Sequence, residues 1–208
     1  MIWILVFQIY KNKTIIKYKK FDINYFFLFT IYVMQTGTIS FCNKTAYNIR
    51  SNDFKDQVLD DIQNKFQQKI IKRHHYSLTK ENVRNVENNP HLVCLRTNGN
   101  PYFLYLTKYH GVNQALFIDK KIQPGYHYPR MISIKFLFDD GLFNGTLFEG
   151  EMVRLDNQPW RYIINDIVSH NGEYLDRVNI LKRISLLYKI IDEKYLFDNE
   201  LNICKIEI

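Results

Sequence analysis

Two short stretches of the sequence place carboxylates between apolar residues, a pattern that can build a polar site inside a sheet. Residues 147–153 contain two glutamates, and residues 160–168 contain an aspartate. Carboxylates are depleted from strand interiors, and burying one without a partner is costly. The pattern therefore predicts a cleft in which the acids meet a cation, a metal ion or a hydroxyl group; the alternative is a strand end whose acids face solvent. The three acids are Glu149, Glu151 and Asp166.

The same stretches resemble motifs of the covalent nucleotidyltransferases, the superfamily of mRNA capping guanylyltransferases and DNA or RNA ligases. Residues 147–153 are similar to the third motif, in which apolar residues precede Asp-Gly-Glu, and residues 162–168 are similar to its companion motif. Residues 96–99 (Arg-Thr-Asn-Gly) resemble the nucleophile motif Lys-x-Asp-Gly, and residues 77–83 resemble the lead-in of capping enzymes. The order and spacing agree best with the capping guanylyltransferases, including those of large DNA viruses.

The resemblance implies a specific chemistry. In this superfamily a lysine attacks the α-phosphate of a nucleotide, here GTP, and forms a covalent nucleotidyl-lysine, while Mg²⁺ or Mn²⁺ neutralises the phosphates. Carboxylates of the third motif hold the ribose or the metal, which makes Glu151 the candidate metal ligand. The nucleotide-binding residues that the resemblance implies are Arg96, Thr97, Asn98, Gly99, Glu149, Glu151 and Asp166.

Arg96 is the most informative departure from the family pattern, because it stands where the nucleophilic lysine is expected. A guanidinium stays protonated at any working pH, so Arg96 cannot form the covalent bond, although it can bind a phosphate through two hydrogen bonds. Asn98 replaces the aspartate of the same motif, and Asn165 stands where an aromatic residue is frequent. These departures predict a catalytically impaired domain, a pseudoenzyme. The lysines that could substitute as nucleophile are Lys108, Lys120 and Lys121.

Three functions are compatible with the sequence. The first is an impaired guanylyltransferase-like domain that binds GTP or a cap-like nucleotide, or that supports a second capping subunit. The second is an active mRNA guanylyltransferase that uses another lysine or a partner subunit and acts on the RNA 5′ end. The third is a structural protein without a ligand. About 16 residues follow Asp192, and the family's later lysine-rich motifs have no counterpart in them, so a partial pocket is expected.

The hydrophobic pattern predicts an α+β fold with a mostly antiparallel sheet and flanking helices. The resemblance implies a nucleotidyltransferase core of the ATP-grasp-like ligase and capping-enzyme type, without the C-terminal oligonucleotide-binding barrel. Apolar residues recur at helical spacing over residues 53–72 and 175–192. Residues 92–95 are expected to form a strand, residues 35–50 to be irregular, and residues 139–141 (Asp-Asp-Gly) to turn a hairpin.

The N-terminal stretch differs in composition from the rest of the chain. The formal net charge is +7, but five of the 28 basic residues and one of the 21 acidic residues lie in residues 1–33, which leaves about +3 for the remainder. Residues 1–33 are expected to be an extension, with Met34 as the working start, or a membrane-surface anchor. Their two apolar runs are shorter than the ~20 residues that a spanning helix needs. The domain is expected to occupy residues 34–208.

Cysteine usage bears on the cell compartment. The chain has three cysteines, which are far apart in the sequence and lack the spacing of a metal site. This usage is typical of a reduced intracellular protein. The expected location is the cytoplasm, or a viral factory or virion if the protein is viral.

Overall fold

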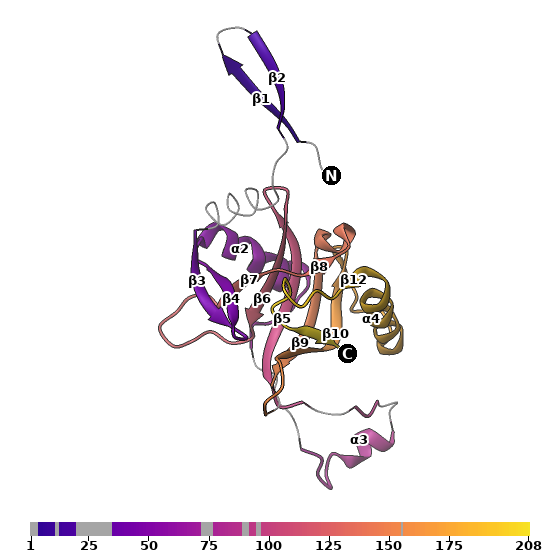
Figure 1. The fold of residues 1–208 in the computed structure, drawn as a ribbon. Coiled ribbons are helices and arrows are strands. Elements are labelled where there is room, and N and C mark those ends of the chain that lie inside the picture. The colour runs from indigo at the N-terminus through magenta and orange to yellow at the C-terminus, as the bar shows by residue number, and fades with distance from the viewer. Residues whose placement is uncertain are drawn as a thin grey trace.

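The computed structural model describes residues 4–10, 13–19, 35–71, 77–88, 92–94, 97–154 and 156–208. Within these residues the fold is α+β, with a large antiparallel sheet and few helices (Figure 1). The elements are β1 (Ile4–Tyr10), β2 (Lys13–Lys19), β3 (Thr36–Phe41), β4 (Lys44–Ile49), α2 (Asn52–Asp60), η1 (Asp61–Lys65), α3 (Val83–Glu87), β5 (Asn100–Tyr109), β6 (Val112–Asp119), β7 (Met131–Ile134), β8 (Leu137–Phe138), η2 (Asp140–Asn144), β9 (Thr146–Val153), β10 (Arg161–His170), β11 (Glu173–Tyr174), α4 (Ile180–Lys194), β12 (Tyr195–Leu196) and β13 (Lys205–Glu207).

The main sheet is nine-stranded among the described residues. Its order is β11-β10-β9-β5-β6-β7-β4-β3, and β13 also pairs with β10. The β10–β13 pair is parallel, whereas the neighbours along the main path are antiparallel. Two smaller sheets pair β1 with β2 and β8 with β12. The described helices include none that combines the length and hydropathy of a membrane crossing.

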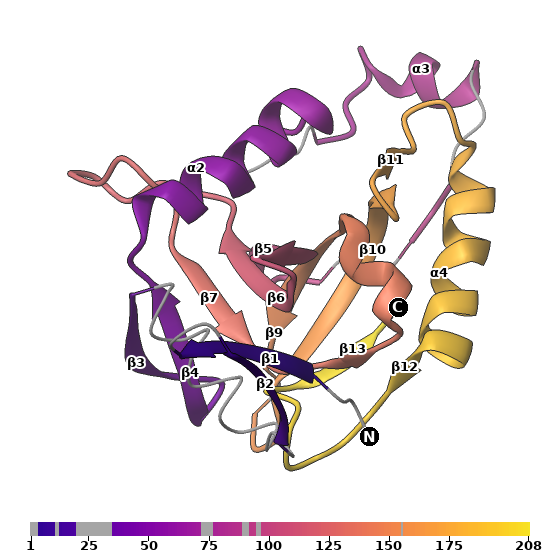
Figure 2. The same cartoon turned by 90° about the horizontal axis from the view of Figure 1, so that it is seen from above.

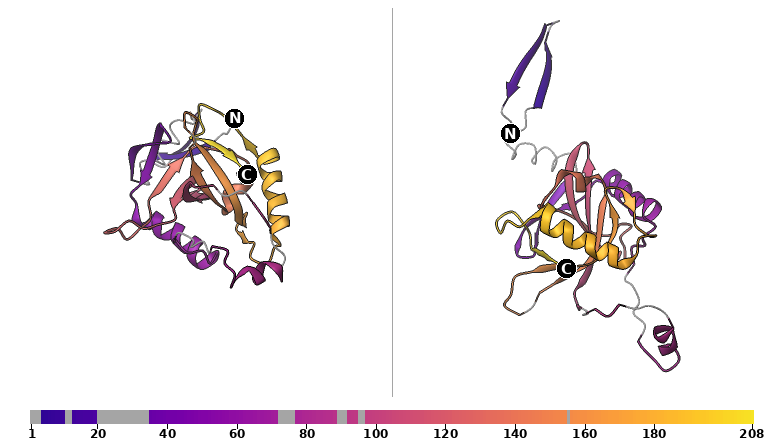
Figure 3. Two further views of the ribbon diagram at one scale, coloured as in Figure 1. Left: turned by 90° about the horizontal axis from the view of Figure 1, so that it is seen from below. Right: turned by 90° about the vertical axis from the view of Figure 1, so that its right-hand side faces the viewer.

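The main sheet buries apolar side chains on both faces, because successive residues of a strand point to opposite sides. On one face, α2 and η1 pack Phe54 and Ile62 in a cluster with Phe103 and Leu147 of the sheet. On the other face, α4, η2 and the C-terminal segment belong to a larger cluster that contains Phe148. Figure 2 shows α2 and α4 on opposite sides of the molecule with the strands between them, and Figure 3 shows the same arrangement from two further sides.

β9 lies between β5 and β10. Its side chains alternate between the two faces of the sheet, and this alternation decides which residues can line one site. Phe148 and Met152 belong to the α4-side cluster, whereas Leu147 belongs to the α2-side cluster. Glu149 and Glu151 therefore share the α2-side face, two and four residues beyond Leu147. The sheet register places each glutamate directly between a residue of β5 and a residue of β10.

Gly150 separates the two glutamates, and its lack of a side chain is a packing requirement. A Cβ atom at this position would lie 2.2 Å from the carbonyl oxygen of Ile163 and 2.8 Å from the ring of Tyr162. The Tyr162 ring is fully buried, and its hydroxyl donates to the carbonyl oxygen of Tyr102 at 3.0 Å. The glycine between the two acids is therefore needed for the β9–β10 pairing itself.

Gly150→Ala is expected to lower the free energy of unfolding by about 2–3 kcal/mol, because the obstruction is a backbone carbonyl that cannot rotate away. For a domain of this size the loss corresponds to a fall in Tm of roughly 5–10 °C. Gly37→Ala in β3 is the control, since an added Cβ there meets only the guanidinium end of Arg50, which can move. Equal melting of the two variants would contradict the packing argument.

Two local expectations are wrong. Residues 35–50 are not irregular: β3 and β4 form a hairpin that turns at Cys42 and Asn43, whose φ angles are 51° and 63°. Both turn positions are left-handed, as a type I′ hairpin requires, but the stretch lacks the Asn-Gly signal that usually marks one. Residues 139–141 do not turn a hairpin either. Asp139 instead accepts a hydrogen bond from the Gly141 amide at 2.9 Å and begins η2, while β8 pairs with β12.

The expected helices exist, but their limits differ. α2 gives way to the π-helical turn η1, which ends at Lys65 and not near residue 72. α4 begins only at Ile180, because the Asn179 side chain caps it by accepting from the Leu181 amide at 2.8 Å. Residues 92–94 do not form a strand, and the side chain of Val93 is fully exposed.

Deletion of residues 1–33 is expected to leave Tm nearly unchanged. The described strands of this stretch, β1 and β2, pair with each other and not with the main sheet. Thermal melting of the full chain and of the shortened chain tests this expectation. A loss of several degrees on deletion would mean that residues 1–33 belong to the folded domain.

Candidate functional site

The segment just before β5, residues 97–99 (called the turn below), is held by Glu151 of β9. The Thr97 hydroxyl donates to Glu151 Oε2 at 2.5 Å, and the Gly99 amide donates to the same oxygen at 3.0 Å. Hydrogen bonds to an ionised acceptor are about twice as strong as those between neutral groups. The carboxylate therefore fixes the backbone of the turn against the sheet.

Gly99 has a structural reason to be glycine. A Cβ atom there would lie 2.6 Å from the Met152 carbonyl oxygen and 2.6 Å from a methyl group of Val153. The turn thus lies directly on the end of β9, and any larger residue would push it off Glu151. Asn98, at the tip of the turn, is exposed. Arg96 lies outside the described residues.

Glu149 forms a buried ion pair with Lys120. Glu149 comes from β9 and Lys120 directly follows β6, and the two residues are only 7% and 3% exposed. The Lys120 ammonium is hydrogen-bonded to Glu149 Oε1 and lies 4.5 Å from the centre of the Phe103 ring. Two opposite charges that leave water together must be well paired to be tolerated. The pair therefore fixes the end of β6 against β9, beside the turn.

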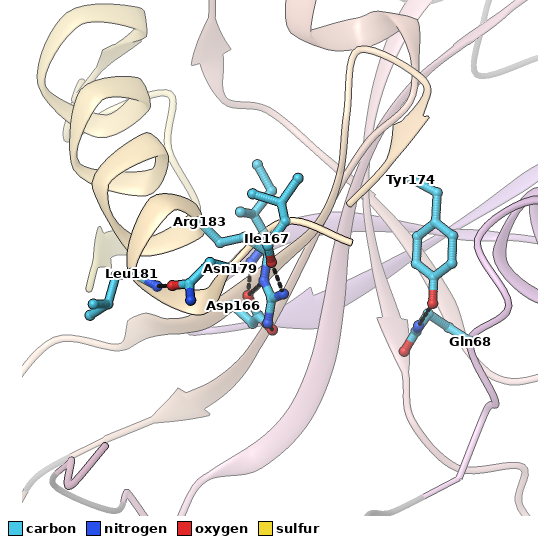
Figure 4. Close-up of polar contacts among 8 residues, drawn as sticks. Gln68, Asp166, Ile167, Tyr174, Asn179, Leu181 and Arg183 are labelled. Atoms are coloured by element: carbon cyan, nitrogen blue, oxygen red, sulfur yellow. Dashed lines mark hydrogen bonds and ion pairs between the residues drawn. The ribbon is translucent and has the colours of Figure 1, made fainter. Parts of the chain in front are cut away.

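Asp166 has a different partner, shown in Figure 4. The Arg183 guanidinium of α4 donates to both carboxylate oxygens, from Nε to Oδ1 at 2.8 Å and from Nη2 to Oδ2 at 3.0 Å. Arg183 also donates to the Val178 carbonyl oxygen at 2.7 Å, and the Ile167 amide donates to Asp166 Oδ1 at 2.8 Å. This two-point pairing connects α4 to β10.

The structure brings some of the expected site residues together and separates others. Thr97, Gly99 and Glu151 form one hydrogen-bonded unit. Asp166 lies opposite Glu149 in the β9–β10 register, but its carboxylate is bound to α4 and not to the turn. The convergence of Glu151 and Asp166 on one ligand stays a prediction.

The sequence did not predict which side chains pair with Glu149 and Asp166. Lys120 was a candidate nucleophile, but its pairing with Glu149 links residues on different strands and has no local signal. Arg183 had a usable signal. It stands four residues before Leu187, which is buried on the inward side of α4, and a charged residue on such a stripe needs a partner on the sheet.

A cavity of about 660 Å³ opens on one side of the turn. It is bounded by residues 97–100, by the ends of β9 and β10, and by the loop between them. Arg154 lies 5.6 Å from the centre of the Trp160 ring, and Arg161 pairs with Glu207 at 3.1 Å. The cavity therefore offers a flat aromatic surface and guanidinium groups next to the turn.

A second cavity, of about 850 Å³, shares Asn100 with the first. Lys55 at the start of α2, Lys121 and Arg130 line it, and Arg130 pairs with Asp119 at 3.3 Å. Partial burial lowers the pKa of Lys55 from its ordinary value. Its walls also contain aromatic residues from the loop after β6, and the positive charge and rings together suit a phosphorylated, ring-bearing ligand. These loop residues are Tyr126, His127 and Tyr128.

Glu151 was the candidate metal ligand. Among the described residues, no group of three or more His, Cys, Asp and Glu side chains is placed to hold a metal ion. Mg²⁺ is usually bound through one or two carboxylates together with substrate phosphates and water. The residues present therefore fit a metal that arrives with a nucleotide and not one held by the protein alone.

Comparison with known proteins gives one family. The family model described as mRNA capping enzyme, catalytic domain, matches residues 35–205, which is most of the chain. A search of curated proteins found no match. The matched region includes every described residue of the turn, of β9 and of β10.

Proposed function

Because the chain belongs to the family of mRNA capping enzyme catalytic domains, we propose that it is a guanylyltransferase-like domain that binds GTP or a cap-like nucleotide but is catalytically impaired. The observation that carries the proposal is the pair of hydrogen bonds that Glu151 accepts from Thr97 and Gly99. It joins the segments that resemble the nucleophile motif and the third motif. Arg96 stands in the nucleophile position of that same segment.

In this proposal each part of the site has a physical role. Glu151 holds the turn and provides a carboxylate for the ribose or for a divalent metal that accompanies GTP. Arg96 and the turn's backbone bind phosphates. The Trp160 ring offers a surface for the base in the smaller cavity. A permanently charged guanidinium cannot act as a nucleophile, so binding without covalent transfer is expected.

The alternative is an active guanylyltransferase that uses another lysine. The positions of Lys108 and Lys120 argue against these two, whereas Lys121 is exposed and lines the larger cavity. Lys108 is eight residues from Asn100 along β5, or about 26 Å at 3.3 Å per residue, and it donates to Asn144 at 2.9 Å. Lys120 is buried in its pair with Glu149. A partner subunit that supplies a nucleophile remains the other form of this alternative.

Nucleotide-dependent melting tests the proposal against a purely structural role. If the folded protein binds GTP, saturating GTP with Mg²⁺ should raise Tm by roughly 5–10 °C, since ligand at 100 times its dissociation constant stabilises by about 2.7 kcal/mol. An unchanged Tm at millimolar GTP and at millimolar cap analogue would contradict nucleotide binding by the protein alone.

The larger cavity supports a second part of the proposal, that the 5′-phosphorylated end of RNA is the partner. Replacing both Lys55 and Lys121 by glutamine should weaken binding of a 5′-triphosphate RNA and flatten its salt dependence, because each phosphate contact releases a counterion. Fluorescence anisotropy measures this. The matched control is the same change at Lys182 and Lys189, which are exposed on α4 outside this cavity. Equal losses in the two double variants would contradict the assignment.

A further inference from the structure

Three sulfur atoms meet in the α4-side core. Cys42, in the β3–β4 turn, lies with its Sγ 3.6 Å from the sulfur of Met152 in β9. Cys204, just before β13, belongs to the same cluster and is 6% exposed. Cys42 packs against this cluster, and its side chain together with burial raises the pKa of Cys204 well above its ordinary value. The two thiols are both free.

The backbone around the two cysteines is fixed by a separate contact. The Lys44 ammonium donates to the carbonyl oxygens of Asn199 and Asn202, at 2.5 Å and 2.7 Å. The β3–β4 turn is thereby held on the segment that leads to β13. A disulfide requires two cysteines that already lie close together, and this contact keeps the chain near Cys42 against the chain near Cys204.

We propose that Cys42 and Cys204 are a redox modification site, at which an intramolecular disulfide forms when the protein meets a low-molecular-weight disulfide such as oxidised glutathione. The inference is independent of nucleotide binding. The bond would join residues close to the two limits of the matched region, 35 and 205. It would lie against Met152, the residue that follows Glu151.

The reaction proceeds by two exchanges. The half-buried Cys42 attacks as a thiolate, breaks the S–S bond of glutathione disulfide, and releases one glutathione thiolate. Cys204 then attacks the Cys42 sulfur as a thiolate and releases the second. The two protein thiols lose two protons and two electrons, and the small disulfide gains them. Because the pKa of Cys204 is raised, its thiolate is scarce near neutral pH, so the second step should accelerate as pH rises.

The experiment treats the full chain with oxidised glutathione at mildly alkaline pH, then measures intact mass, melting and the cysteine-containing peptides. Cys94→Ser is the background, since Cys94 is exposed and would otherwise react with glutathione or with a second chain. In this background we expect a loss of two hydrogens, a peptide linkage between Cys42 and Cys204, and a rise in Tm of roughly 5–10 °C that a reducing thiol reverses.

Cys42→Ser in the same background is the matched control and should show neither the mass loss nor the rise in Tm. Glutathione that stays attached to Cys42, or two thiols that remain free after prolonged oxidation, would overturn the proposal. A covalent dimer through Cys42 or Cys204 would overturn it as well. The assay contains no nucleotide, so none of these outcomes bears on the proposed function.

Discussion

Replacing Lys120 with methionine is expected to lower the free energy of unfolding by roughly 3–5 kcal/mol, because the carboxylate of Glu149 then stays buried without this ammonium. At about 2–4 °C per kcal/mol, Tm should fall by roughly 6–20 °C. Urea unfolding of the wild type and the variant measures the loss directly. Lys205→Met is the control, since Lys205 pairs with Glu207 on the surface, where such a pair contributes less than about 1 kcal/mol.

A double variant separates the cost of a broken pair from the value of the pair itself. Lys120→Met with Glu149→Leu removes both charges and keeps an apolar volume between β6 and β9. Replacing a buried pair by well-packed apolar residues is often neutral or stabilising. We therefore expect the double variant to recover most of the stability that Lys120→Met loses. A single variant as stable as the wild type would show that the pair is not buried in solution.

The second large effect concerns covalent chemistry. The protein alone should form no covalent adduct with α-labelled GTP in the presence of Mg²⁺ or Mn²⁺, because a guanidinium stands in the nucleophile position and Asn98 replaces a carboxylate. Electrophoresis under denaturing conditions after incubation measures this. Arg96→Lys restores only the nucleophile, and positioning and charge stabilisation supply most of the acceleration in phosphoryl-type transfer. This variant should therefore label weakly or not at all.

The contrary result would be an acid-labile, alkali-stable adduct on the unmodified protein, which would establish an active enzyme. Lys120→Gln and Lys108→Gln would then locate the nucleophile, and loss of the label in one of them would identify it. Lys120 has the shorter route to the turn, since its amide donates to the Pro101 carbonyl oxygen at 3.3 Å. Its burial beside Glu149 is the reason that we expect no such label.

The sequence predicted the strands that carry the acids, because their apolar residues and turn signals are local. β9 (Thr146–Val153) contains the whole of the first stretch, and β10 (Arg161–His170) contains all but the first residue of the second. The α+β class followed from the same patterns. The β3–β4 hairpin was missed because its turn, Cys42-Asn43, takes left-handed backbone angles without a glycine.

Side-chain partners were harder to predict, because they depend on how strands distant in sequence are placed. The resemblance brought residues 96–99 and Glu151 to one site, and the structure joins Glu151 to Thr97 and Gly99. It could not reveal that Arg183 binds Asp166, since the helix start at Ile180 sets which face of α4 meets β10. The sequence pattern predicted that this helix begins at residue 175, five residues before its actual start at Ile180.

The most direct test of the account is a calorimetric titration of GTP with Mg²⁺ into the wild type and into Glu151→Ala, with Glu173→Ala as the control for loss of an exposed carboxylate on β11. Glu151→Ala removes the acceptor of both hydrogen bonds that hold the turn. Bonds to a charged group contribute about 1.5–3 kcal/mol each, so affinity should fall at least roughly tenfold in Glu151→Ala and stay unchanged in Glu173→Ala. A wild type that binds no GTP, or a Glu151→Ala variant that binds it as tightly as the wild type, would contradict a nucleotide site at this turn.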